Sequence, residues 1–421
     1  MPFAPSIAIQ MLYNRSTSGL SAQCAGLFRD VVTDFRYNCV FVVFLSISLL
    51  LLALVAAEVP NPARAGSGQP FLAAGRDGAV YMSWVEPAGS GHRMQAAVRE
   101  GGAWRPPGTV AEGSNWFVNW ADYPVLLPFG AVSMAAHWLE RTGASKHSYT
   151  IHLAISGSRE APWRIVFSPT VKQEGQYNGF VSMVATPAGF GAAYLAPAPG
   201  GGEHGKALRF AEFSAGGAVL SDSDVDGDVC SCCQTATAMT AQGPIIAYRD
   251  HEKGEIRDIS IVRRRGGKWT APRPVHRDGW EINACPVNGP ALAASGKRVA
   301  VAWFTGAHDK PRVSAAFSDD SGESFSPAVP IDGGSPAGRV AVLLLDDGSA
   351  MVSWLERIPA GGAEIRLRRV YAGGKPGEAR AVAAVDAARK TGFPQMIATN
   401  GKLLIAWTAD RVRTAEIAIG N

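Results

Sequence analysis

Charged side chains are scarce in this sequence. Asp, Glu, Lys and Arg make up 18% of the 421 residues, and the formal net charge is only +4, without a basic block. Long solvent-exposed helices and disordered tails need more charge than this, and a nucleic-acid-binding surface needs clustered Lys and Arg. We therefore expect a folded chain that has no nucleic acid as a partner.

Cysteine is also scarce, with six residues in the chain. Cys24 and Cys39 lie in the first 65 residues, and the remaining four follow much later in the sequence. No cysteine directly follows the candidate cleavage sites of the N-terminal segment. A lipid anchor on an N-terminal cysteine is therefore not expected.

Residues 1–65 are interpreted as a leader, and residues 66–421 as one domain. An uncharged apolar run covers residues 39–57, arginines precede it, and Ala63-Arg64-Ala65 supplies an A-x-A pattern before Gly66. These are the marks of a secretory signal. The run is close to the minimum length for a membrane span, so a retained anchor is the alternative. We expect an exported protein, periplasmic or extracellular, that meets a membrane only through this segment.

Short apolar segments that end in an aromatic residue are abundant in the rest of the chain. Seven of them end at Trp84, Trp138, Tyr194, Tyr248, Trp303, Trp354 and Trp407, so successive aromatics are 54, 56, 54, 55, 51 and 53 residues apart by subtraction. Within each copy an apolar strand and a glycine-containing turn precede the aromatic strand, and further strands follow. Four strands per unit at this period are typical of a β-propeller blade.

The prediction is an all-β propeller with seven blades, or with six if a terminal copy is not a blade. The last copy stops after its third strand, at residues 413–419. The ring must therefore close with a three-stranded blade or borrow a strand from before Gln69. We expect the propeller to be a monomer.

A turn in the fifth copy has the pattern Ser318-x-Asp320-x-Gly322-x-x-Phe325. Ser and Asp side chains bind neighbouring backbone N–H groups, glycine adopts a positive φ, and the aromatic residue packs into the blade. This turn resembles the Asp-box (BNR) repeat of sialidase-like propellers, in which it is structural.

Four longer motifs carry a second resemblance: Val229 to Thr235 (Val-Cys-x-Cys-Cys-Gln-Thr), Tyr248-Arg249-Asp250, Cys285 to Ala291, and Trp303-Phe304-Thr305. They resemble exported bacterial proteins labelled exo-α-sialidases. The resemblance implies binding of acidic-sugar glycans, with hydrolysis as the sialidase-like activity. Sialidases hold the substrate carboxylate with three arginines and use a Tyr and Glu pair as nucleophile and an Asp as acid/base. Their Arg-Ile-Pro motif stands in the first blade, whereas Arg357-Ile358-Pro359 lies in the sixth copy here.

Propeller topology predicts where a site would lie. The loops before the first strand and after the second strand of each blade share one face, so acids, arginines and aromatics from several copies converge there. Guanidinium groups would hold a carboxylate, paired carboxyls would perform acid/base chemistry, and an indole would stack on a sugar. Ordinary ion pairs between surface loops are the alternative. The catalytic candidates are Asp122, Tyr123, Asp250 and Glu356, and the substrate-binding candidates are Arg141, Arg249, Arg357, Arg339, Trp120 and Asn288.

The four late cysteines, Cys230, Cys232, Cys233 and Cys285, permit two interpretations. An even number in an exported protein favours disulfides. The alternative is a copper(I) or zinc site with His276 as a further ligand. This second interpretation would make the protein a non-catalytic propeller with a metal or redox site, or an interaction scaffold.

The stretch Asp222-x-Asp224-x-Asp226-Gly227 starts like a calcium loop. Cys233 stands where an EF-hand needs a bidentate Glu, so a solvated acidic turn is favoured over calcium. No cofactor is firmly predicted.

Overall fold

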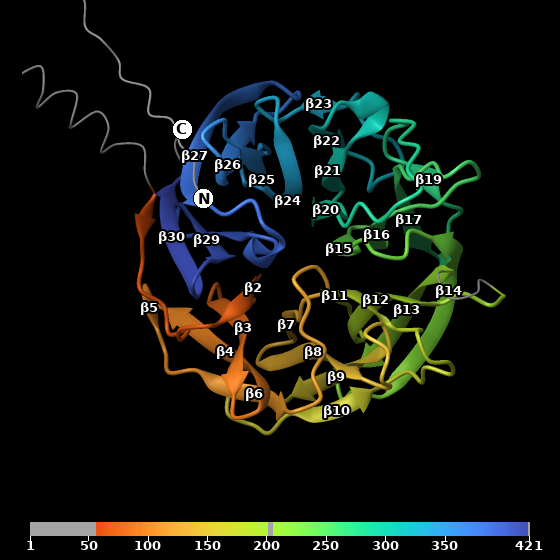
Figure 1. The fold of residues 1–421 in the computed structure, drawn as a ribbon, viewed down its shortest axis with the longest axis vertical. Coiled ribbons are helices and arrows are strands. Elements are labelled where there is room, and N and C mark those ends of the chain that lie inside the picture. The colour runs from red at the N-terminus through yellow and green to blue at the C-terminus, as the bar shows by residue number, and fades with distance from the viewer. Residues whose placement is uncertain (1–55, 201–204, 420–421) are drawn as a thin grey trace, which may run out of the picture. The chain divides into compact units, whose positions relative to one another are not determined.

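The structure is a computed structural model that describes residues 56–200 and 205–419. In this part of the chain, 30 strands form seven antiparallel sheets that stand as blades around a central axis, and two 3₁₀ helices lie in connections between strands (Figure 1). The predicted all-β, seven-bladed propeller is confirmed. The predicted leader lies outside the described residues except for its end. No helix among the described residues has the length and apolar character that crossing a membrane requires.

The first strand of each blade lies next to the axis, and the later strands follow outward. The first three blades contain β2 (Gly68–Ala74), β3 (Val80–Ala88), β4 (Gly91–Glu100), β5 (Ala103–Trp104) and β6 (Gly108–Gly113); β7 (Leu126–Phe129), β8 (Ser133–Arg141), β9 (Tyr149–Ser156) and β10 (Arg164–Phe167); and β11 (Gly179–Ala185), β12 (Gly189–Pro197), β13 (Lys206–Ser214) and β14 (Val219–Val229).

The other blades repeat this order, with η1 (Ala307–Asp309) and η2 (Arg389–Thr391) as the two 3₁₀ helices. They contain β15 (Ala236–Thr240), β16 (Gly243–Arg249), β17 (Ile259–Arg265), β18 (Lys268–Trp269) and β19 (Arg273–Pro274); β20 (Ala291–Ser295), β21 (Arg298–Thr305), β22 (Arg312–Ser318) and β23 (Val329–Pro330); β24 (Pro336–Leu344), β25 (Ala350–Arg357), β26 (Ala363–Val370) and β27 (Pro376–Val385); and β28 (Gln395–Thr399), β29 (Lys402–Thr408), β30 (Val412–Ala418) and β1 (Ala57–Glu58).

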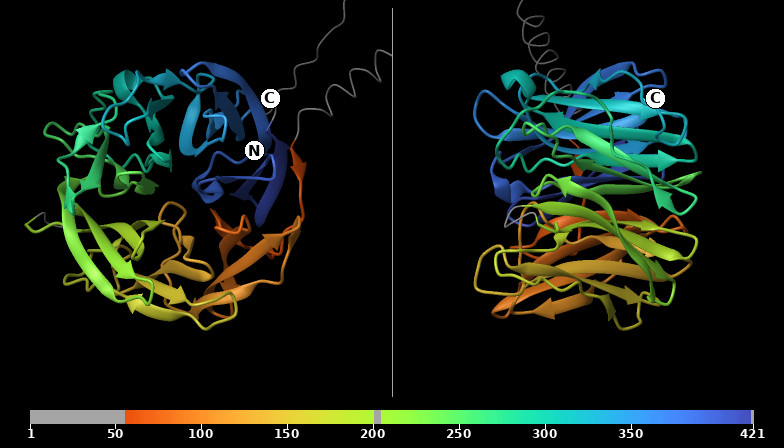
Figure 2. Two further views of the ribbon diagram at one scale, coloured as in Figure 1. Left: turned by 180° about the vertical axis from the view of Figure 1, so that it is seen from behind. Right: turned by 90° about the vertical axis from the view of Figure 1, so that its right-hand side faces the viewer.

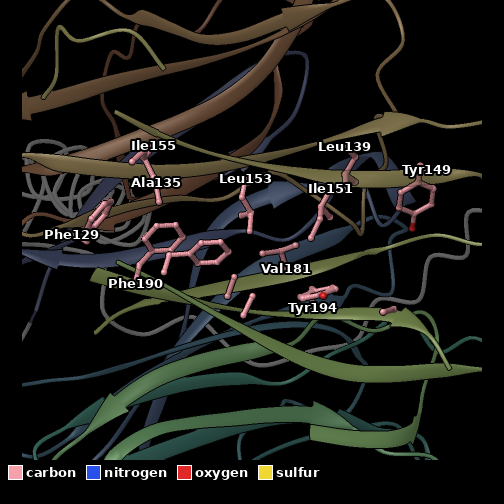
Figure 3. Packing of buried hydrophobic residues seen from close by; sticks show 14 residues of the cluster. Phe129, Ala135, Leu139, Tyr149, Ile151, Leu153, Ile155, Val181, Phe190 and Tyr194 are labelled. Atoms are coloured by element: carbon pink, nitrogen blue, oxygen red, sulfur yellow. The ribbon is translucent and has the colours of Figure 1, made fainter. Parts of the chain in front are cut away.

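The seven aromatic residues of the repeat all lie on the second strands of the blades, as predicted. A second strand is covered on both faces by neighbouring blades, so its sequence is almost continuously apolar. Trp84, Trp303 and Trp354 are at most 1% exposed. Figure 3 shows the packing between the second and third blades, where Phe190 and Tyr194 of β12 meet Phe129 and Ile151.

The indole N–H groups of the repeat need acceptors because they are buried. Four of the five bond to a carboxylate near the same end of the blade, in the pairs Trp84–Glu86 (3.0 Å), Trp138–Glu140 (3.2 Å), Trp303–Asp278 (2.7 Å) and Trp354–Glu356. A carboxylate near this end of the blade is therefore a recurrent partner of the tryptophan.

The ring closes with a strand from the N-terminal side, which was one of the two predicted solutions. Strand β1 pairs with β30 and completes the seventh blade. Val59 N–H donates to Thr414 O (2.8 Å), and Asn61 Nδ2 donates to Val412 O (3.2 Å). Ala63 is also buried against this blade and the first one.

Hydrogen bonds between the starts of the innermost strands form a feature that we call the inner belt. Phe180 N–H donates to Asp122 Oδ1 and Arg339 N–H donates to Asn288 Oδ1, each over 2.8 Å. Both donors have a positive φ and follow a glycine, Gly179 or Gly338. A Cβ on either glycine would lie 2.2 Å from the accepting side chain of the neighbouring blade, so only glycine fits there.

Two predicted turns differ in outcome. The stretch from Asp222 to Gly227 is part of β14 and not a turn, because β13 pairs with it along its length. The Ser318 turn has the expected contacts: Gly322 N–H donates to Ser318 Oγ (2.9 Å), and Ser324 N–H donates to Asp320 Oδ1 (2.9 Å). Phe325 packs against the core of the fourth and fifth blades.

Candidate functional site

A cavity of about 360 Å³ opens among the loops that precede the first strands of the blades. We call it the mouth cavity. Viewed edge-on in Figure 2, the blade strands run between two loop-bearing faces. The cavity is lined by Phe117, Asn119, Trp120, Ala121, His147, Tyr149, Gly175, Tyr177, Phe180, Lys206, Ser231, Cys232, Cys285, Val287 and Arg389. Of the predicted site residues, Trp120, Cys232 and Cys285 line it.

Aromatic rings form much of the cavity wall. Tyr149 is stacked between Phe117 and Tyr177, with ring centroids 3.9 and 4.7 Å apart. Trp120 stacks on Phe393 at 5.9 Å. Stacked rings hold one another in place, so the wall is a rigid apolar surface.

Lys206 is fully buried at the side of this wall. Its Nζ donates to Tyr177 O (3.1 Å) and lies 3.5 Å from the centroid of the Tyr177 ring. Among the described residues no carboxylate forms an ion pair with it. Burial lowers the pKa of Lys206 to about 8, because desolvation disfavours the ammonium form.

Two arginines bring further positive charge to the same place. The guanidinium carbons of Arg339 and Arg389 lie 5.0 and 6.0 Å from the centroid of the Trp120 ring. Burial, followed by repulsion from Arg357 and Arg389, lowers the pKa of Arg339 to about 10. Neither Arg339 nor Arg389 is in an ion pair among the described residues. Arg339 donates to Ala388 O (2.9 Å) and Gly392 O (3.3 Å) and does not line the cavity. The positive charge that faces the mouth cavity is therefore that of Lys206 and Arg389, neither of which has an ion pair among the described residues.

Asp122 and Tyr149 form a buried pair beneath the mouth cavity. The Tyr149 hydroxyl donates to Asp122 Oδ2 over 3.0 Å. Burial raises the pKa of Asp122 to about 7, and burial together with the charge of Asp122 raises the pKa of Tyr149. Asp122 and Tyr123 also line a second cavity of about 200 Å³ among the first strands. Tyr149 lines the mouth cavity and Asp122 lines this second cavity, so the pair lies between the two.

Arg249, a predicted substrate-binding residue, is buried among backbone carbonyls. Its guanidinium donates to Asn288 O (2.7 Å), Arg257 O (2.5 Å) and Phe304 O (2.7 Å) and stacks on Trp280. The residue is 2% exposed. Arg249 therefore connects the fourth and fifth blades.

Glu356, a predicted catalytic residue, has both carboxylate oxygens occupied. Oε2 accepts from the Trp354 indole and Gly333 N–H, and Oε1 accepts from Ser335 N–H (2.6 Å). These donors belong to its own blade and to the loop that precedes it. The carboxylate fixes that loop.

The remaining predicted residues are dispersed. Asp250 is buried beside β14, where burial raises the pKa of its carboxyl to about 6. Arg141 lies over the Phe117 ring at 5.3 Å. Arg357 is exposed at the end of β25. The side chain of Asn288 accepts the Arg339 N–H hydrogen bond of the inner belt.

Three of the four late cysteines lie together. The Sγ atoms of Cys230, Cys232 and Cys233 are all within 4.8 Å of one another. All four late cysteines are free thiols in the structure. His276 lies outside this group and contacts Asp278 through Nδ1 (2.9 Å).

Sequence reasoning missed Tyr149, Tyr177, Lys206 and Arg389. Tyr149 and Lys206 are the first residues of the third strands β9 and β13. The topological argument covered the residues after the second strands but stopped before the third. Extending it to the next strand start would have found both residues.

Comparisons with known proteins support the architecture. No protein-family model matches the chain, and no curated protein matches its sequence. The structure of a polysaccharide lyase of family PL25, an ulvan lyase, superposes with a TM-score of 0.56 at 12% identity, over 86% of this chain and 96% of that one. The same lyase bound to -[GlcA(1-4)Rha3S]- gives the same values. The Hadza microbial sialidase Hz136 superposes with a TM-score of 0.47 at 11% identity, over 79% and 74% of the two chains. At 12% identity the likeness to the lyase shows a shared fold alone.

Proposed function

We propose that this propeller binds glycans through a negatively charged sugar in the mouth cavity. The observation that supports it is positive charge without a carboxylate partner beside a wall of aromatic rings. An acidic sugar has both complementary features, because its C–H faces stack on aromatic rings and its carboxylate accepts hydrogen bonds from cations. The solved lyase complex with a GlcA-containing fragment supports the proposal by analogy of fold.

Replacement of Lys206 gives the most direct test of this proposal. Replacement Lys206→Met keeps the apolar stem and removes the charge, and we expect the affinity for an acidic oligosaccharide to fall by about 10- to 100-fold, since a hydrogen bond to a charged group contributes about 1.5–3 kcal/mol. Titration calorimetry with sialylated and glucuronate-bearing oligosaccharides, each beside its neutral counterpart, measures this. The affinity should also fall as the pH rises through about 8, where Lys206 loses its proton.

Lys146→Met is the matched control, because Lys146 is exposed in the loop that brings His147 to the cavity. It should leave the affinity unchanged. Equal binding of acidic and neutral oligosaccharides, or no binding of either, would contradict the proposal.

The finer proposal is that the Asp122–Tyr149 pair hydrolyses the glycosidic bond. A carboxylate of raised pKa beside a tyrosine is the base that a tyrosine nucleophile needs. Tyr149 Oη would bond to the anomeric carbon while its proton passes to Asp122, the aglycone would leave with a proton from solvent, and water would then release the sugar.

Both members of the pair should be needed for this reaction. We expect Tyr149→Phe and Asp122→Asn each to lower the rate of α-sialoside hydrolysis by about 100-fold or more, the usual value of positioned acid–base catalysis. The rate should rise with pH through about 7, as Asp122 loses its proton. Glu356→Gln is the control and should retain the rate once its melting temperature shows that it is folded. Binding without any hydrolysis by the unmodified chain would restrict the function to recognition.

A further inference from the structure

The three neighbouring thiols form a compact triangle at one side of the mouth cavity. The Sγ atom of Cys230 lies 3.6 Å from that of Cys233 and 3.8 Å from that of Cys232. Cys230 and Cys233 are each 2% exposed, whereas Cys232 is half-buried and lines the cavity. An ion could therefore reach a buried site through Cys232.

The chain holds this triangle from several sides. The three cysteines occupy the bend between β14 and β15, and Cys230 and Cys233 have the Cys-x-x-Cys spacing that places two thiols on one side of a turn. Cys230 N–H donates to Arg249 O (3.1 Å), and the Tyr177 hydroxyl donates to Ser231 O. The bend is thus fixed by the neighbouring blades, and the triangle is preorganised.

The size of the triangle fits a metal ion. Three sulfurs at about 2.3 Å from a central ion are about 3.8–4.0 Å apart, so the two Sγ separations given above need to change only slightly. Thiolates select Cu(I) and Zn(II) among the common metals, and zinc takes four ligands. The compact group supplies three, which favours Cu(I). His276 lies outside the triangle. The Cys285 thiol contacts Cys232 at the edge of the triangle, but it is not within the common spacing of the three.

The surroundings also suit a negatively charged thiolate complex. Binding of Cu(I) by three thiols releases three protons and leaves a net charge of −2 on the complex. Arg257 Nη1 donates to Cys230 Sγ (3.4 Å), although this arginine also pairs with Glu255. Among the described residues the Arg249 guanidinium donates hydrogen bonds only to carbonyl groups, and its positive charge acts on Cys230. The two guanidinium groups therefore offset the charge that the complex would carry.

We propose that Cys230, Cys232 and Cys233 bind one Cu(I) ion as a three-thiolate site that opens into the mouth cavity. The site is separate from the acidic-sugar contacts of Lys206 and Trp120. Its test is independent of any glycan.

The experiment loads the full chain with Cu(I) under anaerobic conditions in competition with a Cu(I) chelator, and measures bound copper by elemental analysis. We expect one copper per chain. Cys230→Ser and Cys233→Ser should each weaken binding by more than about 100-fold, since even an outer-shell partner is worth about 10- to 100-fold. His276→Ala is the control and should retain the copper, because its imidazole lies outside the triangle and contacts Asp278 instead.

Four results would overturn the proposal: no retained copper, equal loss in His276→Ala, displacement of Cu(I) by an equal concentration of Zn(II), or a denatured thiol count that rises on reduction and so reveals a disulfide. If the serine variants unfold, X-ray absorption on the copper-loaded unmodified chain decides the question. Three sulfur neighbours around copper would support the site, and nitrogen neighbours or two sulfurs would refute it.

Discussion

Deletion of residues 2–65 lowers the free energy of unfolding of the propeller by about 3–5 kcal/mol relative to deletion of residues 2–55. The longer deletion removes β1 together with the contacts of Val59 and Asn61 to β30. Four lost hydrogen bonds at about 1 kcal/mol each account for most of this effect, and exposure of the apolar surface under Ala63 adds to it. Urea denaturation of both variants and the full chain measures the difference.

The same pair of variants bears on the predicted leader. Cleavage after Ala65 would remove the strand that completes the seventh blade, so a mature protein starting at Gly66 would be the less stable form. N-terminal sequencing of the protein purified after expression of the full chain identifies the start that is used. Equal stability of the two truncated forms would show that β1 contributes little to ring closure.

Replacement Arg249→Met lowers the free energy of unfolding by about 3–5 kcal/mol, because it leaves several buried carbonyl groups without a donor. These carbonyls belong to the loops of the fourth and fifth blades, so the junction between the two blades is weakened. Chemical denaturation measures the loss. The affinity of the folded variant for an acidic oligosaccharide should stay within about threefold of the original, a difference of under 1 kcal/mol.

Arg264→Met is the control for this replacement. Arg264 lies on β17 of the same blade and pairs with Glu212 near the surface, at 23% side-chain exposure. A pair of this kind contributes about 0–1 kcal/mol. A large loss of affinity with little loss of stability in Arg249→Met would instead support the substrate-binding role that the sequence suggested.

The fold could be predicted because the packing requirement of each blade repeats along the sequence. Each blade must present an apolar second strand to two neighbours, so Trp84 and its six counterparts recur at nearly constant spacing. The inner belt could not be predicted in the same way. Gly179 and Gly338 are required because a side chain of the neighbouring blade packs directly against them. The sequence around each glycine contains no pattern that predicts this contact.

The sequence predicted the face on which the candidate site lies better than it predicted the residues that form the site. Trp120 was found because loops before first strands converge on one face. Glu356 and Arg249 have the residue types of a sialidase site, but their hydrogen bonds go to their own blade or to a blade junction. Residue type alone cannot separate these roles, since a buried carbonyl or indole selects the same side chains as a ligand does.

The closure of the ring also sets the order in which the protein can form. Val59 and Thr414, which bond in the seventh blade, are 355 residues apart in the chain. Joining ends this distant has a large entropic cost, which is recovered only when the other blades already hold the two ends close together. We therefore expect the seventh blade to form last, and its exposed edge to be the place where unfinished chains aggregate or bind a chaperone.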